Sequence, residues 1–175
     1  MGISKDNYFK NFMLGVTSEC MQVDTRQLNS EAILKLLSAA QNQISIISRQ
    51  LDATIFSKQD FIENASEFIR RTKTSNIRIL VHDTEPIVKN NHRILNLSQR
   101  ISSKIEIRTI CNDYAQFNQS YLVADSIGYI HNIKSDLYDA EVNFNDIDKS
   151  KELMETFKTI WELSQQEAEV RRLCI

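Results

Sequence analysis

Five side chains have the types and positions needed to hold an anion. They are Arg49, His92, Arg93, Arg100 and Arg108. Arg49 follows the β-branched run 43–48, and Arg108 ends the run 104–108. The other three residues share one helical segment. A guanidinium offers two parallel N–H groups to a phosphate or carboxylate, and sites in open α/β sheets gather where strands end. The pattern predicts an anion-binding site, with ordinary surface salt bridges as the alternative interpretation.

Sequence motifs for nucleotide, hydrolase or zinc sites are absent. The chain contains no G-x-G-x-x-G, G-x-x-x-x-G-K-[ST], G-x-S-x-G or H-E-x-x-H, and its three glycines could not build the first two. Cys20, Cys111 and Cys174 form no C-x-x-C pair and have no histidine at zinc-ligand spacing. We therefore expect no metal and no cofactor, and we expect side chains to hold any anion.

The composition is that of one soluble globular domain. The chain has 175 residues, of which 25% are charged and 42% hydrophobic. Its apolar runs fall far short of the ~20 residues that cross a bilayer, and no apolar segment resembling a secretory signal follows Met1. We expect a cytoplasmic protein that does not insert into a membrane.

Charge is distributed unevenly along the chain although the net charge is only −2. Lysine and arginine dominate residues 70–108, whereas aspartate and glutamate dominate residues 136–169. A basic middle segment is typical of a surface that contacts nucleic acid. Two solvated surfaces of opposite sign are an equally acceptable interpretation.

Helices and strands are expected to alternate through most of the chain. Helical spacing predicts a helix that begins at Asn29 or Ser30, a second that begins near Ser57 and Asp60, a third over 89–101 and a last over 148–165. Strands are predicted at 43–48, 76–81, 104–108, 120–125, 128–132 and, less regularly, 141–144. This order predicts an α/β fold with a mixed, mostly parallel sheet flanked by helices.

The segment from Gln116 to Gly128 resembles the strand and turn that carry the H-x-K-x-x-x-x-D motif of the phospholipase D superfamily. Asn118 stands at the histidine position, Ser120 at the lysine position, and Asp125 matches the aspartate. In that family the histidine is the nucleophile, the lysine binds phosphate, and the aspartate orients the constellation. Asparagine cannot form a phosphohistidine and serine carries no charge, so the resemblance implies a catalytically inactive domain.

The wider order of the sequence is similar to an uncharacterised bacterial domain that resembles one phospholipase-D-like half and often follows a GNAT acetyltransferase. The matching strings are 49–52, 77–83, 92–108, 122–125 and 157–161. This resemblance divides the chain into an N-terminal extension at 1–27 and a phospholipase-D-like domain at 28–175. Family members with a single motif pair two copies, which implies a homodimer.

Three hypotheses about function follow. The leading one is a catalytically inactive phospholipase-D-like module that binds an anionic ligand or a partner protein. The second is a phosphodiesterase or nuclease that uses a relocated histidine, His92 or His131. The third is a nucleic-acid-binding protein that uses the basic middle segment.

Overall fold

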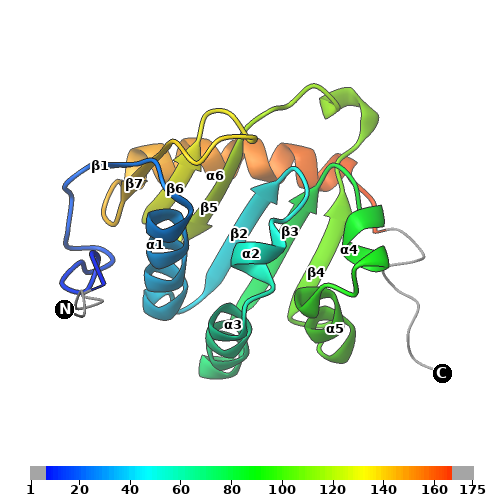
Figure 1. Ribbon diagram of the computed structural model, residues 1–175, viewed down its shortest axis with the longest axis horizontal. Coiled ribbons are helices and arrows are strands. Elements are labelled where there is room, and N and C mark those ends of the chain that lie inside the picture. The colour runs from blue at the N-terminus through cyan, green and yellow to red at the C-terminus, as the bar shows by residue number, and fades with distance from the viewer. Residues whose placement is uncertain (1–6, 167–175) are drawn as a thin grey trace, which may run out of the picture.

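A computed structural model describes residues 7–166, which form one mixed sheet with helices on both faces (Figure 1). The elements in chain order are β1 (Met21–Val23), α1 (Arg26–Ala39), β2 (Gln43–Ser48), α2 (Ala53–Phe56), α3 (Gln59–Arg71), β3 (Asn76–Val81), α4 (Glu85–Lys89), α5 (Arg93–Arg100), β4 (Ile105–Thr109), the 3₁₀ helix η1 (Asn112–Tyr114), β5 (Ser120–Ala124), β6 (Gly128–Asn132), β7 (Ala140–Asn143) and α6 (Ile147–Leu163).

The seven strands lie in the order β1-β7-β6-β5-β2-β3-β4. Two pairings, β2 with β3 and β3 with β4, are parallel, and the other four are antiparallel. The predicted α/β fold with a mixed sheet flanked by helices is confirmed, but the expectation of a mostly parallel sheet was wrong. The connections between β5, β6 and β7 contain no helix and are too short for a parallel crossover, so these strands pair antiparallel.

Helices cover the sheet on both faces. Figure 1 shows α1, α3 and α5 on one face and α6 on the other. Ile44, Ile46, Ile77 and Ile79 belong to the first core cluster, whereas Ile47 and Leu80 pack with α6 in the second. The central strands are buried on both faces, and isoleucine, leucine and valine therefore fill most of their buried positions.

Two helix starts differ from the sequence prediction. α1 begins at Arg26 because the Thr25 side chain accepts a hydrogen bond from the Leu28 N–H, so Asn29 and Ser30 lie inside the helix rather than at its cap. α3 begins at Gln59 without a side-chain cap, and the Ser57 hydroxyl accepts from the Arg93 N–H instead.

The helix predicted over 89–101 is shorter in the structure, where it is α5 (Arg93–Arg100), and a separate short helix, α4 (Glu85–Lys89), precedes it. α4 ends at Lys89 and α5 begins at Arg93, with Asn91 at a φ of 50° between them. Residues with positive φ interrupt a right-handed helix. The break places His92 at the cap of α5, where its ring accepts from the Ile94 N–H.

The described part of the segment expected as an extension packs against the same sheet. β1 pairs with β7, and Phe9 is fully buried with its ring 5.8 Å from that of Phe144. Gly128 allows Leu14 and the backbone of β7 to pack closely against β6. A Cβ at this position would lie 2.6 Å from Leu14 Cδ1 and 3.0 Å from the carbonyl oxygen of Asn143. The division between 1–27 and 28–175 stays a prediction, and α1 crosses it.

Candidate ligand-binding site

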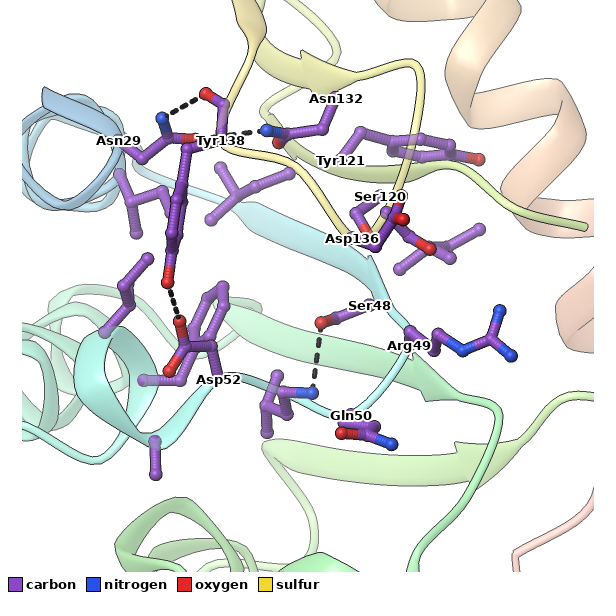
Figure 2. A pocket seen from close by; sticks show the side chains of 18 of the residues that line it. Asn29, Ser48, Arg49, Gln50, Asp52, Ser120, Tyr121, Asn132, Asp136 and Tyr138 are labelled. Carbon is purple, nitrogen blue, oxygen red and sulfur yellow. Dashed lines mark hydrogen bonds between the residues drawn. The ribbon is translucent and has the colours of Figure 1, made fainter. Parts of the chain in front are cut away.

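A cavity of about 600 Å³ opens at the edge of the sheet where β2 and β6 end and β5 begins (Figure 2). Its lining includes buried apolar side chains of α1, α2, β5 and β6: Ile33, Phe56, Leu122 and Ile130. Exposed polar residues of the β2–α2 connection and of the loop 133–139 also line it. Small-molecule sites typically occupy about 300–1,000 Å³. The cavity therefore has the size and lining of a small-molecule site.

Among residues 7–166, Arg49 is the only lysine or arginine that lines this cavity, and it directly follows β2. Its side chain is exposed, and Nη1 donates to Oδ1 of Asn118 at 3.3 Å. Within residues 7–166 it forms no ion pair. Because a guanidinium has five N–H donors, Arg49 keeps several for a ligand.

Asn118 and Ser120 lie where β5 begins. Asn118 Oδ1 also accepts from the Ser135 hydroxyl, and the Ser135 N–H donates to the Asn118 carbonyl at 3.1 Å. Ser120 lines the cavity, and its hydroxyl is buried without a hydrogen-bond partner among the described residues. An unpaired buried hydroxyl costs roughly 1–3 kcal/mol. Ser120 lies in the wall of the cavity, but its hydroxyl itself is closed off from solvent.

Asp125 lies at the opposite end of β5 from these two residues. Its carboxylate accepts three hydrogen bonds of 2.7–2.8 Å from the backbone N–H groups of Gln41, Asn42 and Gln43. Asp125 and Ser126 have φ values of 53° and 57°, which match the tight hairpin turn that joins antiparallel strands. The carboxylate fixes the α1–β2 connection to this turn. It is not placed to orient Asn118 or Ser120, contrary to the role that the family resemblance implied.

His92 lines the cavity but is already engaged within the fold. The ring is buried, Nε2 donates to the Leu51 carbonyl at 3.1 Å, and Nδ1 accepts from the Ile94 N–H at 3.3 Å. Burial lowers the pKa of His92 from its ordinary value of 6.5. The imidazole is therefore a neutral cap of α5.

The other three candidate arginines lie outside the cavity lining. Arg93 donates to Gln59 Oε1 at 2.9 Å, and Arg100 is exposed at the last residue of α5. Arg108 pairs with Glu106 at 2.8 Å and donates to the Trp161 carbonyl at 2.9 Å. Its guanidinium also lies 4.2 Å from the centre of the Trp161 ring. The structure thus brings only Arg49 and His92 of the predicted set to one place.

A second polar network at the cavity was not predicted from the sequence. Arg26 Nε donates to the Tyr138 hydroxyl at 2.9 Å, and this hydroxyl donates to Asp52 Oδ2 at 2.7 Å (Figure 2). Burial would raise the pKa of Asp52, but hydrogen bonds from Thr54 and Tyr138 outweigh it and lower the pKa. Arg26 and Tyr138 are 112 residues apart, so no local pattern could have indicated the contact.

The remaining histidines also have partners in the fold. His131 Nε2 donates to Gln119 Oε1 at 2.9 Å, and burial together with Lys149 lowers its pKa. His82 bonds to the Phe117 backbone, and its pKa is lowered by burial and by the nearby charge of Arg49. Both imidazoles are therefore predominantly neutral at pH 7.

No three His, Cys, Asp or Glu side chains within 7–166 gather as a metal-binding group. In the same part of the chain, none of the helices is both long and apolar enough to cross a membrane. Cys20 and Cys111 are free thiols, and Cys174 lies outside the described residues.

Comparisons with known proteins place the chain in a family and a fold. The family described as Domain of unknown function (DUF7931) matches residues 25–173. The comparison with curated proteins gave no match. Placement after an acetyltransferase stays a prediction.

Three solved structures have a similar fold. TrmBL2, an archaeal chromatin protein with a novel mode of DNA binding, matches with a TM-score of 0.65 and 16% identity over 91% of this chain and 57% of that chain. Nuc from Salmonella typhimurium, a phospholipase D family member, matches with a TM-score of 0.61 and 13% identity over 85% of this chain and 97% of that chain. NucT from Helicobacter pylori matches with a TM-score of 0.59 and 10% identity over 85% of this chain and 99% of that chain. This chain therefore spans little more than half of TrmBL2, and the expected phospholipase-D-like fold is confirmed.

Proposed function

This chain belongs to the DUF7931 family, a domain of unknown function, and we propose that it is a non-catalytic phospholipase-D-like module that binds a small ligand carrying an anionic group. One observation carries the proposal. Among the described residues, a single cation, Arg49, lines the 600 Å³ cavity, and it bonds to Asn118 and shares the cavity with Ser120. Asn118 and Ser120 are the two residues that the resemblance aligns with the histidine and the lysine of the family motif, which supports the proposal.

The state of the histidines supports the absence of catalysis. A nucleophilic or basic imidazole needs a free ring nitrogen directed at the substrate. His92 uses both ring nitrogens within the fold, and His131 uses Nε2 to bond Gln119. Asn118 supplies no nucleophile and Ser120 no charge for a phosphate. A phosphodiesterase with His92 or His131 as relocated nucleophile is therefore the weaker hypothesis.

Nucleic-acid binding is the second candidate, because the similar structure of TrmBL2 is that of a DNA-binding protein. Several cations of the basic middle segment are, however, engaged within the fold. Arg71 donates to the Ala40 carbonyl, Lys104 to the Thr72 carbonyl, and Arg78 lies over the ring of Trp161. A mobility-shift titration with DNA and RNA at two salt concentrations tests this candidate. Binding through phosphate contacts would weaken steeply as salt rises.

A hydrolysis panel tests the proposed lack of catalysis. The full chain is incubated with bis-p-nitrophenyl phosphate, DNA and RNA, with and without divalent cations. We expect no product above the buffer control. Product formation that is lost in His92→Gln or His131→Gln would contradict the proposal and support the relocated-histidine hypothesis.

Thermal stabilisation tests the proposed binding. A ligand that binds only the folded state raises the melting temperature, and the rise grows with the ligand's concentration relative to its Kd. Small carboxylates, sulfonates and phosphates should stabilise the wild type more than Arg49→Gln. Equal stabilisation of both proteins by every compound would contradict the role of Arg49.

We also propose a homodimer, on the family expectation alone. Sedimentation velocity over a range of concentrations tests it. A single monomeric species at every concentration would contradict it.

A further inference from the structure

The mouth of the cavity carries one unneutralised charge of each sign. Arg49 and Asp136 both line the cavity, both are exposed, and neither forms an ion pair with a residue between 7 and 166. Figure 2 shows Asp136 near Ser120 on one side of the view and the hydrogen-bonded pair of Tyr138 and Asp52 on the other.

Asp52 is the second carboxylate that lines the cavity, but hydrogen bonds within the fold already occupy its oxygens. Its Oδ1 accepts from the Thr54 N–H and hydroxyl at 2.8 and 2.7 Å, and its Oδ2 accepts from Tyr138. Its lone pairs are therefore largely used within the fold. Asp136 is the carboxylate that remains available at the mouth.

The interior of the cavity favours an apolar body. Ile33, Ile55, Leu122 and Ile130 contribute aliphatic surface, and such surface is stabilised by removing it from water.

We propose that the cavity binds a small amphipathic zwitterion, with the chemistry of an aliphatic or aromatic α-amino acid. The apolar body lies inside, the carboxylate contacts Arg49, and the ammonium contacts Asp136. A purely anionic ligand would leave Asp136 repelling it, and a polyanion such as nucleic acid would be repelled more strongly. This inference rests on the proposed function and specifies its ligand class.

Three compounds with one indole body separate the two charges. Tryptophan has both, indole-3-propionate lacks the ammonium, and tryptamine lacks the carboxylate. Calorimetric titration of the full chain at neutral pH should rank tryptophan first, with each of the other two about fivefold weaker, the factor expected for losing one exposed charge pair. A single-stranded oligonucleotide should not compete with tryptophan.

Two variants assign the charges to residues. Arg49→Gln should weaken tryptophan and indole-3-propionate about fivefold and leave tryptamine unchanged, whereas Asp136→Asn should weaken tryptophan and tryptamine and leave indole-3-propionate unchanged. Arg93→Gln and Asp139→Asn are matched controls, because both residues are exposed and lie outside the cavity lining. Circular dichroism confirms that each variant is folded.

The outcomes separate this inference from the proposed function. If indole-3-propionate binds as tightly as tryptophan and Asp136→Asn weakens neither, the zwitterion inference is overturned while an anion-binding cavity stands. If tryptamine binds best, or if no compound binds, both are overturned. Competition by the oligonucleotide would also overturn the inference and favour a nucleic-acid partner.

Discussion

The two ends of β5 carry the three motif positions, and they differ in what they do. At one end Asp125 accepts three backbone hydrogen bonds and holds a tight turn. At the other end Asn118 and Ser120 lie beside Arg49 and the cavity, and the Ser120 hydroxyl has no partner among the described residues. The comparison teaches that one end of β5 stabilises a turn, whereas the other end lies at a cavity and makes mainly exposed contacts.

The largest effect is expected at the Asp125 end. Asp125→Ala should lower the free energy of unfolding by about 3 kcal/mol, because three backbone N–H groups lose a charged acceptor. Asp125→Asn is the matched control, since asparagine also tolerates positive φ and keeps one acceptor oxygen, and it should lose about half as much. Urea unfolding measures both. A loss below about 0.5 kcal/mol for alanine would show that the two ends do not differ.

Substituting His92 should lower the free energy of unfolding, as substituting Asp125 should, although His92 lines the cavity. His92→Ala removes the α5 cap and the bond to the Leu51 carbonyl, and should cost about 2 kcal/mol in the same assay. His92→Asn retains the cap and should recover about half of this loss. An unchanged stability with altered ligand binding would instead place His92 in the ligand site.

Stability should also fall in mild acid. His82, His92 and His131 all have pKa values lowered chiefly by burial from an ordinary value of 6.5. Below pH 6.5 these imidazoles become protonated in the unfolded chain more readily than in the folded chain. The free energy of unfolding should therefore decrease as the pH falls below 6.5. It should not depend on these groups above pH 7. His92→Gln should show a shallower decrease, and an identical profile would contradict the neutral cap.

The smallest effect on stability is expected at the Asn118 end. Asn118→Ala should change the free energy of unfolding by less than about 0.5 kcal/mol because its contacts are exposed. Ser120→Ala should be neutral or slightly stabilising, since it removes a buried hydroxyl that lacks a partner among the described residues. A loss above about 1.5 kcal/mol for either variant would mean that this end is also part of the stabilising framework.

Local patterns predicted the elements but not their assembly. The strands at 43–48, 76–81 and 128–132 match because they are short segments rich in β-branched or aromatic residues, which favour strands. The break at Asn91 was missed because it depends on one positive φ inside a helical pattern. The strands predicted at 120–125 and 128–132 are also confirmed, and they form the antiparallel pair β5 and β6.

The candidate site was less predictable than the fold. Arg49 was identified because it follows a strand, whereas Arg108 has the same local signal but packs against Trp161. That choice depends on where α6 lies, which no short segment specifies. Asp136 and Tyr138 reach the cavity through the β6–β7 loop, and their partners or neighbours are distant in the chain.

Mapping ligand contacts along β5 tests the central claim most directly. An ¹H–¹⁵N spectrum of the full chain is recorded during titration with tryptophan, the zwitterion of the binding experiment. The account predicts shifts that saturate for residues 48–52, 118–121 and 135–138, with residues 41–43 and 124–127 at the Asp125 end unchanged. Shifts concentrated at the Asp125 end, or no saturable shift at the Asn118 end, would contradict it.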